Sequence, residues 1–210
     1  QVRGISTTQI TNLSNDQVKA LSSAQVKALS SDQINRLTVD QLQAIDNTDI
    51  AAMTTAQVNT ISATQIANLS NDQLKALSTA QVRAMTVDQL NHLTADQFGA
   101  LTTAEVAALS TSQASQLGAT QLVAMTTAQV QALSTAAIQK LSVAQISNLS
   151  NDQVKALSSA QVKALSSDQI NRLTTDQLQA IDTGDIAAMT TAQVRGISTT
   201  QITNLSNDQV

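Results

Sequence analysis

The chain has 210 residues and a formal net charge of −4, and it contains one phenylalanine but no tryptophan, tyrosine, cysteine or proline. The missing cysteines exclude disulfide bonds and thiolate metal sites. The acidic balance and the shortage of aromatic rings for base stacking argue against a nucleic-acid ligand. No apolar run approaches the length of a membrane span, so we predict no membrane insertion.

An eight-residue repeat runs through the sequence. Every eighth residue from Ile5 to Leu205 is Leu, Ile or Met; the second position is nearly always Ser or Thr, the fifth nearly always Gln, the sixth mostly Val, Ile or Leu, and the eighth usually Ala. A Ser or Thr followed three residues later by Gln is a capping box, in which both side chains bond backbone N–H groups that the first helical turn leaves free. The repeat predicts a helix of about six residues after each cap, first over 7–12 and then every eight residues to 199–204.

The repeat length rules out one continuous helix. Eight residues at about 100° each leave roughly 80° of drift per repeat, so the aliphatic row would wind around the helix instead of forming a stripe. Helices this short are unstable alone, so the octads must stack on one another. In a β-solenoid, the alternative, strict alternation would place the first and sixth positions on opposite faces. We therefore predict an all-α solenoid with one short capped helix per octad.

Two further patterns concern polar residues. Asp is concentrated at the fourth position, near the start of each helix, and Lys and Arg at the seventh, in its last turn, where each charge interacts favourably with the helix dipole. Larger polar residues replace the eighth-position Ala at intervals averaging about 3.4 octads, or roughly 27 residues, which predicts one polar edge per superhelical turn, with Ala facing a close neighbour elsewhere. The alternative is that this position simply tolerates polar residues. The series is Asn12, Arg36, Thr60, Asn68, His92, Gln116, Lys140, Asn148, Arg172 and Asn204.

The octad register is uniform, without a linker or a shift in composition. It predicts a single continuous solenoid over residues 1–210 that is a segment of a longer array. Residues 1–18 recur unchanged as 193–210, and residues 9–58 recur as 145–194 with four differences. Both shifts are whole octads, which is typical of block duplication.

Few residues suggest chemistry. The single histidine, His92, belongs to the eighth-position series, so we expect it in solvent rather than in a catalytic or metal site. Asp46 with Asp49, and Asp182 with Asp185, form acidic pairs with suitable reach for calcium. They also occupy the cap and third helical positions, and are more simply interpreted as caps. We predict no catalytic, cofactor-binding or metal residue, and no enzyme.

Three classes of function remain open. The first is a structural repeat protein that forms a rod or filament segment, such as an extracellular stalk or fibre, and associates with further copies or repeats. The second is a binding or adhesion module that uses a polar edge of octad positions 7 and 8. The third is ice or crystal-surface binding through Thr pairs such as Thr54-Thr55, although Ser replaces Thr in many octads. We favour the first class. The polar edge would consist of Asn35-Arg36, Asn91-His92, Ser115-Gln116, Gln139-Lys140 and Asn171-Arg172.

The octad resembles the repeat tracts of very large bacterial surface proteins, often described as adhesin-like or haemagglutinin-like. Blocks such as Leu13-Ser-Asn-Asp-Gln-Val-Lys-Ala and Leu77-Ser-Thr-Ala-Gln-Val-Arg-Ala carry this resemblance, which covers the entire chain. The resemblance implies export, an extracellular or cell-surface setting, and many more octads. It implies no cofactor and transfers no functional residue.

Overall fold

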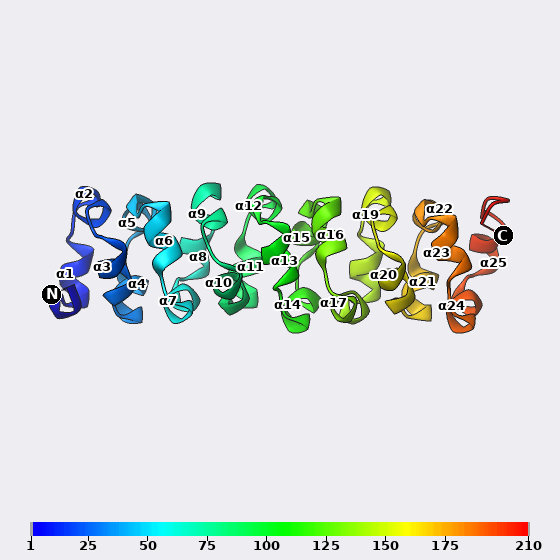
Figure 1. The fold of residues 1–210 in the computed structure, drawn as a ribbon, viewed down its shortest axis with the longest axis horizontal. Coiled ribbons are helices and arrows are strands. Elements are labelled where there is room, and N and C mark those ends of the chain that lie inside the picture. Colours follow the sequence, from blue (N-terminus) through cyan, green and yellow to red (C-terminus); the bar gives the residue numbers. More distant parts are fainter. Residues whose placement is uncertain (1, 210) are drawn as a thin grey trace. The chain divides into compact units, whose positions relative to one another are not determined.

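The computed structural model describes residues 2–209, and every regular element in that range is a short helix of three to six residues, with no strand (Figure 1). The prediction of an all-α solenoid of short helices is confirmed, and the alternative of a β-solenoid is wrong. The chain divides into two compact units, residues 1–108 and 109–210.

The backbone restarts at each octad because two consecutive residues are extended. Leu29, at the first position, has φ −61° and ψ 146°, and the next residue, Ser30, has φ −74° and ψ 159° before helix α4 (Ser31–Arg36) begins. No described residue has a positive φ, so the helices end without the left-handed cap that glycine often supplies. The predicted capping box forms in every helix that combines a Ser or Thr cap with Gln or Glu at the third helical position.

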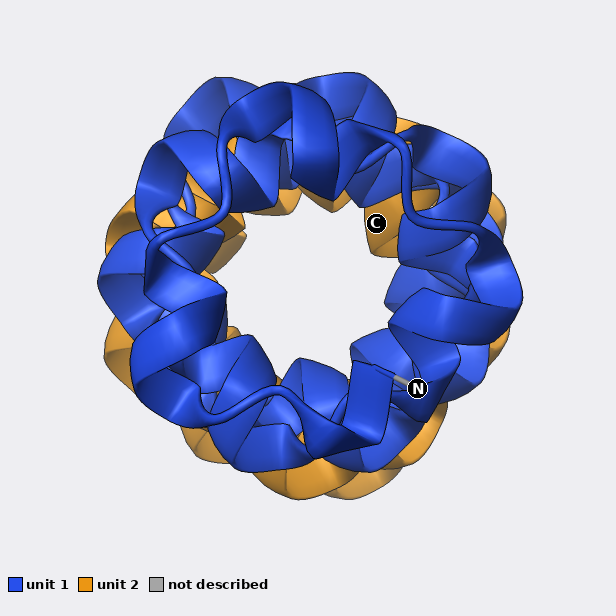
Figure 2. Cartoon of the chain, turned by 90° about the vertical axis from the view of Figure 1, so that its left-hand side faces the viewer, with its two compact units in different colours: residues 1–108 blue, residues 109–210 orange. Residues whose placement is uncertain are grey.

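In unit 1, most helices stack on the helix three places along the chain, as α1 does on α4, α2 on α5 and α7 on α10. Viewed along the stacking direction, the helices of this unit form a ring (Figure 2). Its elements are η1 (Val2–Gly4), α1 (Thr7–Thr11), α2 (Asn15–Lys19), α3 (Ser23–Ala28), α4 (Ser31–Arg36), α5 (Val39–Ala44), α6 (Asn47–Ala52), α7 (Thr55–Thr60), α8 (Ala63–Ile66), α9 (Asn71–Lys75), α10 (Thr79–Ala84), α11 (Val87–His92), α12 (Ala95–Ala100) and α13 (Thr103–Ala107).

Unit 2 follows the same rule, with α14 stacked on α17, α18 on α21 and α21 on α24. Because stacking joins every third helix, one coil of either unit contains between three and four octads, close to the predicted interval. The elements of unit 2 are α14 (Thr111–Ser115), α15 (Ala119–Ala124), α16 (Thr127–Ala132), α17 (Thr135–Lys140), α18 (Val143–Ser147), α19 (Asn151–Lys155), α20 (Ser159–Ala164), α21 (Ser167–Arg172), α22 (Thr175–Ala180), α23 (Thr183–Ala187), α24 (Thr191–Gly196) and α25 (Thr199–Ile202).

The core of each unit consists of the first and sixth octad positions. Every first-position aliphatic from Leu29 to Ile181 is at most 6% exposed, and the sixth-position residues from Ile10 to Leu178 are at most 1% exposed. The single aromatic side chain, Phe98, is one of these fully buried residues. Burial of two apolar side chains per octad supplies the stacking energy that one octad lacks alone.

The eighth position separates small from large residues as predicted. Nearly every eighth-position Ala is half-buried, whereas the larger polar residues of the series are exposed, except for the half-buried Thr60. Each such Ala lies at the end of its helix, where a larger side chain has less room beside the neighbouring coil. The polar residues therefore mark the places where the end of a helix is open to solvent.

Candidate functional surface

The fifth-position glutamine is the most heavily used polar side chain of the octad. In α19, Gln153 is 3% exposed, and its Oε1 accepts the N-cap N–H of Ser150 at 2.9 Å. Its Nε2 donates to the carbonyl oxygens of Leu122 and Met125, each at 2.8 Å, in the preceding coil. One amide thus caps its own helix and bonds the end of another.

The same link recurs with a fixed spacing along both units. The Nε2 atom donates to the carbonyl 28 residues earlier at 2.6–2.9 Å, and in many octads also to the carbonyls 30 or 31 residues earlier. These carbonyls lie at the carboxyl ends of short helices, where the intrahelical donors run out. The Leu122 carbonyl also accepts the Met125 N–H, at 3.3 Å. We call this series of fifth-position Gln side chains the glutamine ladder. Its Nε2 atoms donate to backbone carbonyls that stacking buries.

The capping-box analysis of the sequence missed this second role. A box alone accepts Glu as well as Gln, and Glu would interact more favourably with the amino end of a helix. Yet Glu occurs only at position 105. The scarcity of Glu was the signal that the amide Nε2 is needed as a donor.

The residues that replace Gln at the fifth position show which hydrogen bonds require the amide group. Glu105 is 2% exposed and keeps the box, because its Oε2 accepts the N–H of Thr102 at 2.6 Å. Burial raises the pKa of the Glu105 carboxyl, although the hydrogen bonds from Thr102 oppose this shift. Ala137 keeps only the bond from its own N–H to the Ser134 hydroxyl, at 3.1 Å. Asp49 has no donor for the carbonyls and instead accepts a 2.5 Å hydrogen bond from Ser23 Oγ.

The interpretation of the two Asp pairs as caps is only half correct. Asp46 and Asp182 occupy the cap position with extended backbones, but neither side chain makes a cap hydrogen bond. Their backbone carbonyls do accept the first bonds of α6 and α23. Within residues 2–209, no group of three or more His, Cys, Asp or Glu side chains is placed to hold a metal ion. In the described part of the chain, neither Asp46 with Asp49 nor Asp182 with Asp185 is therefore joined by a third side chain of these types.

The predicted polar edge at octad positions 7 and 8 lies on helices that stack on one another. In unit 1, α4, which ends at Arg36, stacks on α7, which ends at Thr60, and α8 stacks on α11, which ends at His92. In unit 2, α18 stacks on α21, which ends at Arg172. Of the residue pairs proposed for this edge, Asn91 and Ser115 are half-buried and the other members are exposed.

His92 lies on this edge as expected, with its side chain 51% exposed. Its Nδ1 atom lies 2.8 Å from the Asp88 carbonyl oxygen and 3.2 Å from the Asp88 carboxylate. These contacts join residues one turn apart on the same helix, so His92 stays at the helix surface.

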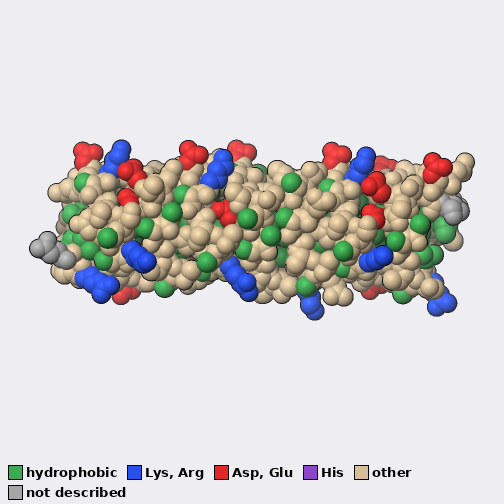
Figure 3. All heavy atoms as spheres, viewed as in Figure 1, with side chains coloured by type: hydrophobic (Ala, Val, Ile, Leu, Met, Phe, Trp, Pro, Cys, Tyr) green, Lys and Arg blue, Asp and Glu red, His purple; other side chains and the backbone are tan. Residues whose placement is uncertain are grey.

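The outer surface carries charges of both signs. Figure 3 shows acidic and basic side chains on the face drawn, among small hydrophobic spots and a larger area of uncharged side chains and backbone. Asp residues lie in the first turns and Lys or Arg in the last turns of helices such as α2, α9 and α19, as predicted. Among the described helices, none has the length and apolar character of a membrane span.

Comparison with known sequences identifies the octad. The family model described as the ALTTAQ repeat matches residues 16–46, 42–79, 66–103, 122–159, 148–180 and 178–210. No curated protein sequence matches the chain. The letters ALTTAQ correspond to octad positions 8 and 1 to 5, as in the segment from Ala124 to Gln129. Because the matches together cover most of its length, the chain belongs to the ALTTAQ repeat family.

Proposed function

We propose that this chain is a structural element, a stiff spacer within a rod or filament built from stacked octads. The glutamine ladder carries the proposal, because within each unit amide hydrogen bonds as well as apolar contacts join successive coils. Such links resist bending more than apolar contact alone, since hydrogen bonds are directional. The regular first, fifth and sixth positions of the octad are used in stacking, whereas the variable third, fourth and seventh positions are mostly exposed.

The setting we propose is extracellular or at the cell surface, without enzymatic activity. The resemblance to repeat tracts of very large bacterial surface proteins supports this setting. Further repeats or further copies of the chain would extend the array in the same register. Labelling of intact cells with an antibody to the chain tests the location, and signal that requires permeabilisation would contradict it.

A length series tests the spacer role. Removal or duplication of seven octads, 56 residues, changes the array by about two coils. Packed helices lie about 8–10 Å apart, so the length of the array should change by roughly 20 Å. Small-angle X-ray scattering measures the maximum dimension of each variant. A maximum dimension that does not follow the number of octads would show that the coils do not add in line, and the spacer proposal would fail.

Binding through the polar edge is a second candidate, favoured by one feature of unit 2. A shallow hollow there is lined by Val143, Asp168, Asn171 and Arg172, which combine an apolar side chain with both charges. Val143 is 38% exposed. A glycan or peptide array screened against the chain and its Arg172→Ala variant tests this role, and ligands that bind both equally would exclude the hollow.

A further inference from the structure

Four copies of the tripeptide Asn-Leu-Ser occur in the chain, at residues 12–14, 68–70, 148–150 and 204–206. An Asn followed by a residue other than Pro and then by Ser or Thr is the acceptor motif for N-linked glycans in secreted proteins. In each copy, Asn takes the eighth octad position, Leu the first and Ser the second. No other Asn of the chain is followed two residues later by Ser or Thr. We call these four tripeptides the acceptor motifs.

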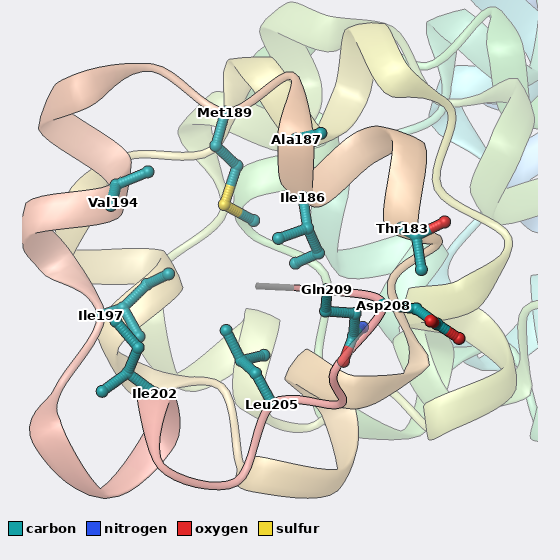
Figure 4. A pocket seen from close by; sticks show the side chains of 10 residues that line it. All are labelled: Thr183, Ile186, Ala187, Met189, Val194, Ile197, Ile202, Leu205, Asp208 and Gln209. Carbon is teal, nitrogen blue, oxygen red and sulfur yellow. The ribbon is translucent and has the colours of Figure 1, made fainter.

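Each acceptor motif directs its polar side chains outward and its leucine inward. Asn68 and Ser70 are exposed, whereas Leu69 is 3% exposed. The motif at 148–150 in unit 2 has the same pattern. Figure 4 shows the direction of the leucine in the motif at 204–206, where Leu205 points into an apolar hollow that Ile186 also lines. The amide and the hydroxyl that define the motif therefore both face solvent in the interior of each unit.

The acceptor motifs lie between helices rather than inside them. Asn148 is the C-cap of α18, with φ −82° and ψ −11°, and Ser150 is the extended N-cap of α19, with φ −70° and ψ 161°. Asn68 follows α8, which ends at Ile66, and precedes α9, which begins at Asn71. Surface connections of this kind are the usual location of acceptor asparagines, because an enzyme can reach them without opening a helix.

A glycan on Asn68 is compatible with the stacking of the coils. Asn68 Nδ2 donates to the Thr64 carbonyl at 2.8 Å. A side-chain amide has two hydrogens, and an N-linked sugar replaces one of them, so a donor for Thr64 remains. The inter-coil bonds here use backbone carbonyls instead, since Gln97 Nε2 donates to the Leu69 carbonyl at 2.8 Å and Gln43 Nε2 to the Asn68 carbonyl at 2.5 Å. The glutamine ladder and the glycan therefore do not compete for the same atoms.

Within each unit, the two acceptor motifs are 56 residues apart. These seven octads make two coils of three and a half octads, in agreement with the three to four octads that one coil contains. In unit 1, the helices that follow the motifs, α2 and α9, lie on the same side (Figure 1). Glycans would therefore project from one side of the unit, at every second coil.

We propose that Asn68 and Asn148, with the equivalent Asn12 and Asn204, are acceptors of N-linked glycans. The donor is a sugar diphosphate carried by a nucleotide or by a lipid. Asn Nδ2 forms a bond to the anomeric carbon, the bond from that carbon to the diphosphate oxygen breaks, and the diphosphate leaves with the electron pair. A base of the transferase takes one Nδ2 proton. This inference rests on the extracellular setting proposed above, because the motif is used in secreted proteins.

The test is peptide mass spectrometry of the full chain, recovered from the cells that naturally produce it. Trypsin cleaves after Lys140 and Lys155, so residues 141–155 form one peptide that contains both Asn148 and Asn151. Asn151 is also exposed but has no Ser or Thr two residues later, so it is an internal control. We expect the mass of a glycan at Asn148 and none at Asn151.

Variants made in the same cells separate the acceptor motif from simple exposure. Ser150→Ala removes the hydroxyl and should abolish the glycan at Asn148, whereas Ser150→Thr keeps both the hydroxyl and the helix cap and should retain it. Asn148→Gln should also lose the glycan, and its control Asn151→Gln should keep it. Circular dichroism checks that each variant keeps its helical content.

A cell extract supplied with a radiolabelled nucleotide sugar distinguishes the two donors. Labelling of the chain after the membrane lipids have been removed would identify a nucleotide-linked donor. Labelling that requires the lipid fraction would identify a lipid-linked donor.

Three results would overturn the inference: unmodified Asn68 and Asn148 in the recovered chain, an equal glycan content at Asn151, or a glycan at Asn148 that survives Ser150→Ala. The extracellular setting is judged separately, by antibody labelling of intact cells. A chain that is labelled on intact cells but has no glycan would leave the setting and the spacer role intact.

Discussion

Residues 9–58 in unit 1 and 145–194 in unit 2 have nearly the same sequence but different neighbours. Gln17 and Gln153 are equivalent, and each forms the capping box of an identical helix. Gln17 is exposed, whereas Gln153 is 3% exposed and bonds two carbonyls of the coil before it. Leu13 is half-buried, and its equivalent Leu149 is 4% exposed.

The two copies distinguish the features that one octad specifies alone from the features that neighbouring coils supply. The octad itself specifies the cap and the short helix, because these are the same in both copies. The preceding coil supplies the acceptors for the glutamine amide and contributes to the burial of the first position. The sixth position depends on the following coil instead, since Val58 is 0% exposed and its equivalent Val194 is 45% exposed. The preceding coil should therefore matter more for stability at the fifth position than at the sixth.

The largest expected effect is at the interior glutamine. Gln153→Ala removes the three inter-coil hydrogen bonds of Nε2 and one cap bond, and deprives the Met125 carbonyl of its Nε2 donor, for a loss of about 3 kcal/mol. Gln17→Ala removes the cap bond alone and should cost about 1 kcal/mol. Urea denaturation followed by circular dichroism measures both, and equal losses would contradict the inter-coil role.

The sixth position provides the contrasting pair. Val18 and Val154 are both 1% exposed, so truncation to Ala leaves a similar cavity in each copy. We expect each substitution to cost about 2 kcal/mol. If Val154→Ala proved much more costly than Val18→Ala, the burial of this position would depend on the preceding coil, and the separation drawn above would be wrong.

Glu105 predicts a dependence of stability on pH. Since burial raises the pKa of this carboxyl in the folded chain, its folded state binds the proton more tightly than its unfolded state does. Its stabilising contribution is therefore present below the ordinary value of 4.5 and is lost as the pH rises through the raised pKa. Glu105→Gln restores a donor 28 residues after Leu77 and should add about 1 kcal/mol at pH 7.

Thermal denaturation between pH 3 and pH 8 checks this effect, with buffers of equal ionic strength. The control is Asp96→Asn, which also removes a carboxyl but at an exposed site in the first turn of α12. The advantage of Glu105→Gln over the wild type should shrink at acidic pH. A constant advantage at every pH would show that protonation of Glu105 has no part in stability.

The smallest effect concerns the cap residues. Ser150 accepts the Gln153 N–H at 3.1 Å, and Ser150→Ala should cost about 1 kcal/mol. Asp46 makes no side-chain cap bond, so Asp46→Ala should change stability by less than about 0.5 kcal/mol. Differential scanning calorimetry with and without calcium compares the two variants. A calcium-dependent rise in melting temperature that Asp46→Ala abolishes would instead identify the acidic pair as a cation site.

Much of the fold was accessible from the sequence because each octad contains a complete local signal. The cap at Ser150, the box with Gln153 and the aliphatic pair of Leu149 and Val154 all lie within one octad. The bonds from Gln153 to Leu122 and Met125 were not predicted, since they depend on which octads become neighbours. The cap role of Asp46 was wrong in part, and the lack of Gln in its helix does not explain this, since Ser134 caps α17 without a Gln.

The central claim is that the glutamine amides bond the preceding coil, and their hydrogen exchange tests it most directly. Side-chain NH₂ exchange can be measured by NMR on dilute, monomeric protein labelled at glutamine. We predict strong protection for Gln153 and Gln161, which donate to buried carbonyls, and exchange close to that of free glutamine for Gln9 and Gln17. Equal exchange rates in the two groups would contradict the account.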